Sequence, residues 1–320
     1  MYRALSIVAG LLLASPTFAA TQPYPARPVR LVVPFAPGGG TDITARYVAT
    51  RLAEKFGQPV VVDNRPAAAG VLGADVVAKA APDGYTVLVV SVTFVISSAL
   101  QKGLPYDGRR DFAPITLLIA SPLGLLIHPT VPAKTVNELV AYAKANPGKL
   151  NYGSSGAGSI AHLSTELFDS MAGVKMTHVP YKGVAAYTTA QLANEIQVGM
   201  SNLFSTMPHW KAGRLRLLAH GGAQRIDSMP DLPTIAESGV PGYEAMIWYG
   251  FMAPAKTPRA IVQTLYREIH AIAASPDARK LFASQGNEVL ANTPEEFART
   301  IAAESKKWGD IGRRLGVTLQ

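Results

Sequence analysis

The sequence contains no cysteine among its 320 residues. This absence excludes a disulfide framework and a lipid attached to an N-terminal cysteine, so a hydrophobic core has to stabilise the fold. Outside the N-terminal region, no continuously apolar run reaches the roughly 20 residues that span a bilayer. We therefore expect the mature protein to be soluble.

Long runs of one charge are missing as well. The chain carries a net charge of +8, but its basic residues are scattered and no basic run is longer than a pair such as Arg109-Arg110. Clustered basic residues are the usual mark of a nucleic-acid-binding protein, so we expect no nucleic-acid partner. The mild positive field instead favours small anionic molecules.

The N-terminal region has the order of features found in a secretory signal peptide. Arg3 is followed by an apolar run over residues 4–14 and then by small residues up to Ala19 and Ala20. A buried N-terminal helix is the alternative interpretation, although a domain rarely begins with one. We predict a signal peptide over residues 1–20 that is cleaved after one of the two alanines, and hence an exported protein.

Apolar runs then alternate with helical patterns in two series, which is typical of βαβ units and a parallel sheet. The first series predicts strands over 29–35, 59–64 and 85–91, with helices over 42–56 and 70–80. The second predicts strands over 122–128, 150–154, 175–181, 195–201 and 215–220, with helices over 135–146, 159–171 and 183–193. The end of the chain predicts a strand over 248–254 and helices over 258–274, 276–285 and 294–312.

Two α/β series with a helical tail predict two domains, with chain crossings near 120–125 and 245–250. An amphipathic helical tail needs a sheet to cover, so we expect it to return to the first domain. Domain 1 would then comprise residues 26–123 and 248–320, and domain 2 residues 124–247.

Three consecutive glycines, Gly38 to Gly40, stand between the first strand and the following helix. Backbone N–H groups and the helix dipole attract anions at such a place, and glycine lets a ligand approach the backbone itself. Thr41 or Asp42 can cap the helix. An ordinary strand-to-helix turn is the alternative, but it would need only one glycine. A dinucleotide-binding G-x-G-x-x-G motif is excluded because Ile43 stands where its last glycine belongs.

The segment over 151–163 repeats this order of strand, small residues and helix. Gly153 and Gly158 have the spacing of a P-loop, but Ser159 occupies the place of the required lysine. A G-x-S-x-G nucleophile motif also fails, because alanine follows Gly156. We interpret the segment as a second anion cradle. Two cradles suit a ligand with polar groups at both ends, held in a cleft between domains.

The sequence shows no metal or catalytic motif. Its six histidines form neither H-x-x-x-H nor H-E-x-x-H, so we expect no metal and no cofactor. No Ser/His/Asp set or carboxylate pair stands out either, so we assign no catalytic residue. His162 lies three residues after Ser159, where ligand contact and local packing are both open. Lys182 faces solvent or ligand, and we expect the Trp248-Tyr249 pair in the core.

Several segments, in order along essentially the whole mature chain, resemble the tripartite tricarboxylate transporter substrate-binding (Bug-type) receptors of Gram-negative bacteria. They include "PVRLVVPFAPGGGTDITAR", "LNYGSSGAGSIAHL", "HVPYKG" and "WYGFMAPAKTP". The resemblance implies an α/β, two-domain periplasmic binding protein fold (type II-like), in which each domain is a mostly parallel sheet flanked by helices and the ligand cleft lies between them. It also implies a non-enzymatic receptor in the periplasm that closes on a small carboxylate.

The resemblance further implies which residues form the site. In the family, the loop matching Phe35 to Asp42 holds a carboxylate, and the other matching segments lie on the opposite wall. We therefore expect the ligand to contact Phe35, Ala36, Gly39, Gly40, Thr41, Asp42, Ser91, Ser154, Ser155, Gly156, Gly158, Ser159, His162, Tyr181, Lys182, Gly183 and Asn202. The expected protein partners are the membrane permease subunits of a tripartite tricarboxylate transporter, and we expect the receptor to be a monomer.

The sequence departs from the family at one point of the expected site. Where many members have phenylalanine, aspartate and asparagine, this chain has Met200-Ser201-Asn202. Loss of the aspartate removes a partner for an ammonium group, so we expect a di- or tricarboxylate or an aromatic carboxylate rather than an acidic amino acid. Two alternatives to transport stay open at this point, namely a sensory receptor that signals to a membrane kinase and a secreted hydrolase.

Overall fold

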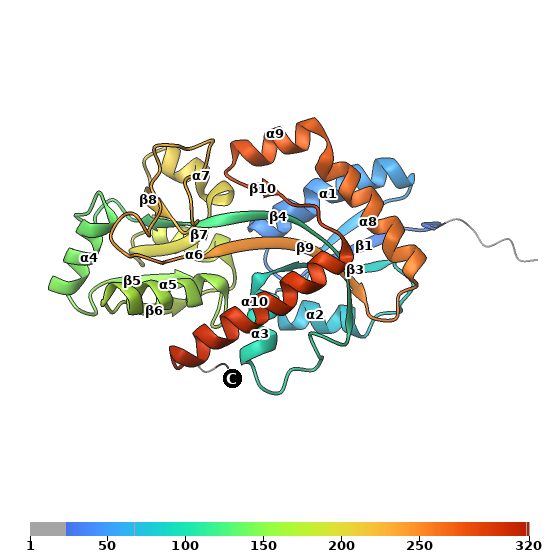
Figure 1. The fold of residues 1–320 in the computed structure, drawn as a ribbon, viewed down its shortest axis with the longest axis horizontal. Coiled ribbons are helices and arrows are strands. Elements are labelled where there is room, and N and C mark those ends of the chain that lie inside the picture. The colour runs from blue at the N-terminus through green and yellow to red at the C-terminus, as the bar shows by residue number, and fades with distance from the viewer. Residues whose placement is uncertain (1–23, 67, 318, 320) are drawn as a thin grey trace, which may run out of the picture.

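The computed structural model describes residues 24–66, 68–317 and 319. The signal peptide predicted over residues 1–20 lies outside these ranges. Within them, no helix combines the length and the apolar character needed to cross a membrane. The described chain forms two lobes that share two long strands, β4 (Phe112–Ile127) and β9 (Met246–Pro254) (Figure 1).

The first lobe is built on three parallel strands in the order β2-β1-β3. Strands β1 and β3 are short apolar runs that are buried almost throughout, as expected of parallel strands covered by helices on both faces. Helix α3 follows β3 without a loop, at a place where the sequence predicted no helix. The elements of this lobe are β1 (Val29–Val33), α1 (Gly40–Phe56), β2 (Val60–Asn64), the 3-10 turn η1 (Ala68–Gly70), α2 (Val71–Ala78), β3 (Thr86–Ser91) and α3 (Val92–Leu100).

The second lobe repeats this plan with parallel strands in the order β7-β5-β6. Strand β8 pairs with β4 in antiparallel orientation, and helix α7 follows β7 directly, again where no helix was predicted. The elements of this lobe are α4 (Val136–Ala145), β5 (Asn151–Ser154), α5 (Ile160–Ala172), β6 (Thr177–Pro180), α6 (Val184–Leu192), β7 (Val198–Asn202), α7 (Leu203–Lys211) and β8 (Arg216–His220).

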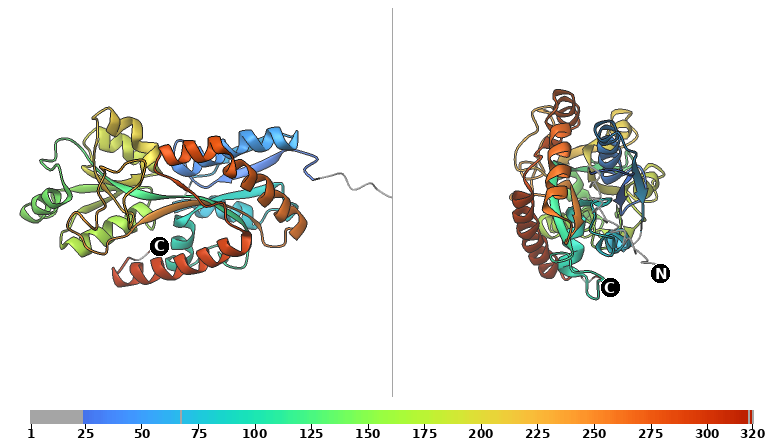
Figure 2. Two further views of the ribbon diagram at one scale, coloured as in Figure 1. Left: turned by 45° about the horizontal axis from the view of Figure 1, so that its top comes forward. Right: turned by 90° about the vertical axis from the view of Figure 1, so that its right-hand side faces the viewer.

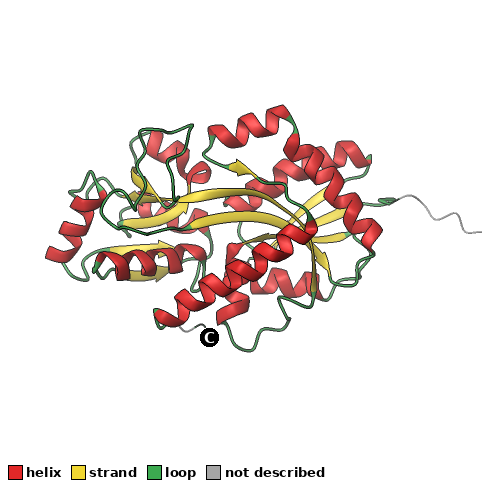
Figure 3. Cartoon of the chain, viewed as in Figure 1, coloured by secondary structure: helices red, strands yellow, loops and turns green. Residues whose placement is uncertain are grey.

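Strands β4 and β9 run antiparallel to each other through both lobes (Figure 3). The first part of β4 pairs with β9, and its last part, from Leu123 to Ile127, pairs with β7. The prediction of a strand over 122–128 therefore found only the end of a much longer strand. The predicted domain boundaries, 123/124 and 247/248, fall inside these two strands and stay a prediction.

The C-terminal segment lies against the first lobe. Helix α8 packs on α1 and β4, and helix α10 packs on α3 and β4. A capping box between Thr293 and Glu296 begins α10, whose apolar stripe buries Phe297 and Trp308 completely. Figure 2 shows the tail helices on one side of the molecule in its right-hand view. The elements of the tail are α8 (Arg259–Ala274), α9 (Pro276–Ser284), β10 (Glu288–Val289) and α10 (Pro294–Arg314).

Candidate ligand site between the two lobes

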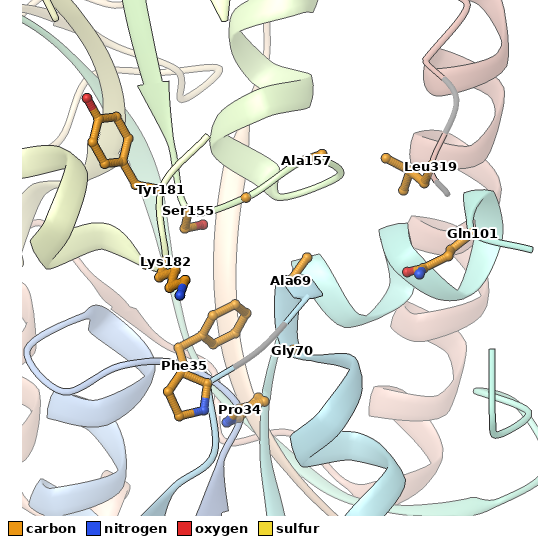
Figure 4. A pocket seen from close by; sticks show the side chains of 13 residues that line it. Pro34, Phe35, Ala69, Gly70, Gln101, Ser155, Ala157, Tyr181, Lys182 and Leu319 are labelled. Atoms are coloured by element: carbon orange, nitrogen blue, oxygen red, sulfur yellow. The ribbon is translucent and has the colours of Figure 1, made fainter. Parts of the chain in front are cut away.

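Two adjoining cavities are lined by residues of both lobes. The inner cavity has a volume of about 30 Å³, and the outer cavity has a volume of about 200 Å³ (Figure 4). Phe35 and Ser155 line both. The inner cavity is lined by Phe35, Ala36, Gly39, Gly40, Thr41, Ser91, Thr93, Leu123, Ser155, Ile160, Ala161, Val184, Tyr187, Met200, Ser201, Asn202, Ile247 and Tyr249. The outer cavity is lined by Pro34, Phe35, Pro66, Ala69, Gly70, Gln101, Ser155, Gly156, Ala157, Tyr181, Lys182, Gly183 and Leu319.

Each of the three consecutive glycines has its own structural reason. Gly38 has a φ of +87°, a conformation that side chains disfavour. A Cβ atom on Gly39 would touch Val184 of the other lobe at 3.7 Å, and a Cβ atom on Gly40 would overlap the hydroxyl of Tyr249. The glycine loop therefore lets the first turn of α1 approach both α6 and β9 at the inner cavity.

Hydrogen bonds to the Asp42 carboxylate fix the conformation of the glycine loop. The carboxylate accepts hydrogen bonds from the Gly38 N–H at 3.0 Å, from Arg46 Nε at 3.0 Å and from Asn64 Nδ2 at 3.0 Å. Burial opposes the charged form of Asp42, but these hydrogen bonds outweigh it and lower the pKa of the carboxyl group. Asp42 was predicted to contact the ligand. That contact stays a prediction, since the hydrogen-bond partners of the Asp42 side chain all lie in the first lobe and the residue lines neither cavity.

Three helix N-termini at the cavities have no side-chain cap. They belong to α1, α3 and α6, whose N-cap residues are Gly39, Ser91 and Gly183. The first N–H groups of a helix have no partner within the helix, and the helix dipole adds a partial positive charge at this end. The lining of the cavities thus offers backbone donors to an anion from both lobes.

Two buried hydroxyl groups of the inner cavity lack a hydrogen-bond partner in the described part of the chain: Ser201 Oγ and Tyr249 Oη. The Tyr249 hydroxyl lies beside the Asn202 amide without hydrogen-bond geometry, and burial raises its pKa well above the ordinary value. Tyr187, close to Ser201, is satisfied because it donates to the Met200 carbonyl at 2.9 Å. Unpaired buried hydroxyls are costly unless a ligand or water satisfies them.

The opposite wall is less open than the sequence suggested. Ser159 caps α5 by accepting from the His162 N–H at 3.3 Å, and the Ile160 N–H donates to Thr93 Oγ1 of the other lobe at 3.3 Å. Asn202 caps α7 by accepting from the Ser205 N–H at 2.9 Å. The interpretation of the segment over 151–163 as a second anion cradle stays a prediction, because the Ile160 and His162 N–H groups already have partners whereas Ser155 and Gly156 line the cavities.

The remaining predicted residues of this segment make contacts inside the protein and do not line the cavities. Ser154 Oγ is bonded to His178 Nε2 at 2.7 Å, and a Cβ atom on Gly158 would overlap Leu319. His162 Nδ1 accepts from the Gly158 N–H at 3.1 Å, and its ring stacks on that of His178 with centroids 4.0 Å apart. Ser154, Gly158, Ser159 and His162 thus line neither cavity, and of the two interpretations of His162, local packing is the one that the geometry supports.

The other predicted residues come together at the cavities. Phe35, Ala36, Gly39, Gly40, Thr41, Ser91, Ser155 and Asn202 line the inner one. Gly156, Tyr181, Lys182 and Gly183 line the outer one. Sequence reasoning missed Thr93, Tyr187 and Tyr249. Trp248 is buried against Phe297 as predicted, whereas Tyr249 faces the inner cavity and not the core alone. Strand alternation, which sends neighbouring side chains to opposite faces, could have indicated this.

Comparison with known proteins agrees with this architecture. A family model described as the tripartite tricarboxylate transporter family receptor, TctC, matches residues 44–317. The chain belongs to this receptor family. It is 35% identical to the protein BugT of Bordetella pertussis over 325 aligned positions, which cover 100% of this chain and 99% of BugT. The family predicted from the sequence is confirmed.

Solved structures of relatives share the fold of this TctC receptor. R. palustris Rpa4515 with adipate superimposes with a TM-score of 0.90 at 37% identity, covering 92% of this chain and 99% of that protein. The periplasmic binding protein BugD superimposes with a TM-score of 0.88 at 33% identity, covering 93% of this chain and 100% of BugD. The predicted periplasmic binding protein fold is confirmed.

Proposed function

We propose that this TctC-family chain is a periplasmic receptor that captures a small carboxylate between its lobes and delivers it to the permease of a tripartite tricarboxylate-type transporter. One observation carries the proposal: the uncapped N-termini of α1, α3 and α6 meet at cavities whose described lining residues include no aspartate or glutamate. Such a site favours an anion.

The inner cavity supplies directional donors for a carboxylate. The N–H groups at the start of α1 and α3 come from the first lobe, and the free hydroxyls of Ser201 and Tyr249 come from β7 and β9. Charge-assisted hydrogen bonds of this kind are about twice as strong as neutral ones. Binding therefore needs no metal or covalent step, and the adipate bound by the relative Rpa4515 belongs to the proposed ligand class.

Ligand binding would also favour the closed arrangement of the lobes. Gly39 faces Val184, and the Ile160 N–H is bonded to Thr93, so both contacts join one lobe to the other. A ligand that contacts both walls binds the closed arrangement more tightly than an open one, so it shifts the population towards the closed arrangement. The closed, loaded form would then be the form that the permease subunits recognise, with the receptor acting as a monomer and without catalysis.

A thermal-shift screen of refolded, ligand-stripped protein tests the proposal. The panel comprises aliphatic di- and tricarboxylates, aromatic carboxylates, acidic amino acids and the amides of the same acids. A ligand that binds only the folded form at a hundredfold excess over its Kd adds about 2.7 kcal/mol of stability. We expect shifts with carboxylates and none with amides. Shifts confined to the amides, or conversion of a ligand seen by mass spectrometry, would contradict the proposal.

A further inference from the structure

No charged side chain lines the inner cavity among the residues that the structure describes. A carboxylate bound there would therefore interact with charges that lie behind the lining. One of them is Asp42, which directly follows the lining residue Thr41 and is buried. Asp42 is the third residue of α1, so it lies in the first turn of the helix whose N-terminus is expected to bind the anion.

The carboxyl group of Asp42 is negatively charged at neutral pH. Burial alone would raise its pKa, but hydrogen bonds from Arg46, Gly38 and Asn64 lower it below the ordinary value. An acidic residue in the first turn stabilises a helix through its dipole. Without a positive partner, however, the same charge would repel a carboxylate ligand, because charges in a partly buried site are only weakly screened. The glycine loop therefore brings a negative charge to an anion site.

Arg46 offsets this charge from the next turn of α1. Its Nε atom donates to both oxygens of Asp42, at 3.1 and 3.0 Å, and the two residues have the i,i+4 spacing that suits ion pairs on a helix. The Asp42 side chain is 4% exposed and the Arg46 side chain 54%. The pair thus has its negative end inside the protein and its positive end at the surface, and Arg46 lines neither cavity.

A second contact joins Arg46 to the segment that lines both cavities. Arg46 Nη2 donates to Asn64 Oδ1 at 3.1 Å, and Asn64 Nδ2 donates to the Phe35 carbonyl at 3.0 Å. The ring of Phe35 borders the outer cavity (Figure 4). Two routes therefore connect Arg46 to a ligand, one through the charge of Asp42 and one through the position of Phe35. They predict different results when the charge of Asp42 is removed together with that of Arg46.

We infer that Arg46 is a positioning residue for anion binding, which acts through Asp42 by neutralising the charge that the carboxylate brings to the glycine loop. This inference rests on the proposed function and adds to it a residue outside the cavities. Asp42 holds the Gly38 N–H, and the guanidinium of Arg46 offsets its charge. A carboxylate ligand then reaches the uncapped N-terminus of α1 without repulsion. The Asn64 contact orients the guanidinium.

Calorimetric titration of the ligand-stripped protein with succinate, adipate, malate, citrate and benzoate tests the inference. At low ionic strength, Arg46→Gln should weaken the binding of each carboxylate that the wild type binds by about tenfold. Adding Asp42→Asn removes the repelling charge and should recover affinity by about threefold or more. Arg46→Lys keeps the positive charge without the planar fork, so it should bind within about threefold of the wild type.

Two controls separate the local charge effect from other causes. Arg51→Gln removes a positive charge from the same helix, but this guanidinium contacts the carbonyl and the ring of Tyr47, so the variant should bind as the wild type does. The loss in Arg46→Gln relative to the wild type should shrink in about 1 M salt, where the Debye length falls to about 3 Å. Thermal unfolding without ligand checks that each variant folds. Arg46→Met, which keeps an apolar stem, is a second uncharged variant and should lose the same affinity.

The outcomes separate this inference from the proposed function. Wild-type affinity in Arg46→Gln, equal affinity of Arg46→Gln and Arg46→Lys, or a loss that the added Asp42→Asn leaves unchanged or deepens would overturn the inference and leave a carboxylate receptor. The last of these results would assign the effect to the route through Phe35. A wild-type protein that binds none of the five carboxylates would overturn both the inference and the proposed function.

Discussion

Gly40 and Tyr249 touch so closely that a Cβ atom on the glycine would overlap the tyrosine hydroxyl. The two residues are far apart in the sequence, but both line the inner cavity. Tyr249 lies opposite Ser91 in the antiparallel pair of β3 and β9, so the register of the sheet places its hydroxyl at the first turn of α1. This contact is how the glycine loop and the central strands form one binding surface.

Gly40→Ala should therefore damage both the fold and the site. We expect a loss of about 1–3 kcal/mol in the free energy of unfolding, as for other overpacked interiors, and at least a tenfold loss of carboxylate affinity. Denaturant unfolding and calorimetry measure the two effects. Gly39→Ala is the matched control, because its Cβ atom meets Val184 at an ordinary distance and should cost less than about 1 kcal/mol. Equal behaviour of the two variants would refute the steric role of Gly40.

A larger side chain at Gly39 should act on closure rather than on folding. Gly39→Leu would insert its side chain between the lobes at Val184 and hold them apart. We expect about a tenfold or greater loss of affinity, with an unfolding free energy within about 1 kcal/mol of wild type. Adding Val184→Ala should restore part of the affinity. If the double variant binds as weakly as Gly39→Leu, contact with α6 is not the cause.

Removing the hydroxyl of Tyr249 tests whether this group forms a hydrogen bond with the ligand. Since this hydroxyl is buried without a partner, Tyr249→Phe should leave the ligand-free protein as stable as wild type or more stable. Carboxylate affinity should fall about fivefold, the equivalent of one hydrogen bond. Tyr187→Phe is the comparison: its hydroxyl donates to the Met200 carbonyl, so the variant should lose about 1 kcal/mol without ligand. Undiminished affinity in Tyr249→Phe would remove this hydroxyl from the site.

The stacked histidines predict how stability depends on pH. Burial lowers the pKa of His162 to about 4, and burial together with the neighbouring His162 lowers that of His178 to about 4, below the ordinary 6.5. The unfolded chain therefore binds two protons that the folded chain excludes, and stability should fall as the pH drops from about 6.5 towards 4. Burial raises the pKa of Asp169 to about 7, which has the opposite effect over the same range but involves one proton.

Variants separate these contributions. The slope of unfolding free energy against pH, measured by urea unfolding between about pH 5 and pH 7, should flatten in His178→Gln. It should steepen in Asp169→Asn, which removes the opposing group. A wild-type slope in both variants would show that other groups set the acid sensitivity of the fold.

Most of the fold could be predicted because its strands and helices have clear periods. The exceptions have physical causes. In β4, Pro114 and Pro122 argue against a strand, but register shifts near Pro114 and pairing along β9 accommodate them. The segment from Val92 to Leu100 follows β3 without a turn signal and begins with β-branched residues, which disfavour a helix. Tertiary contacts of α3 with α10 override this local preference.

The site could be predicted only in part. The backbone donors at Gly38–Gly40 can be predicted from the sequence, because consecutive glycines before a helix indicate an exposed backbone at the helix N-terminus. The role of Tyr249 is not visible in the sequence, since it follows from the register of strands that are distant in the chain. His162 was ambiguous for a related reason: its partner His178 comes from another element, and only the packed structure shows the stacked pair.

The most direct measurement compares a dicarboxylate with its own diamide by calorimetric titration of the ligand-stripped protein. The two molecules have similar length and shape, but only the acid carries negative charge to the helix N-termini of α1, α3 and α6. The account predicts saturable binding of the dicarboxylate, weakened by Tyr249→Phe, and no detectable binding of the diamide. Equal binding of both molecules, or preference for the diamide, would contradict it.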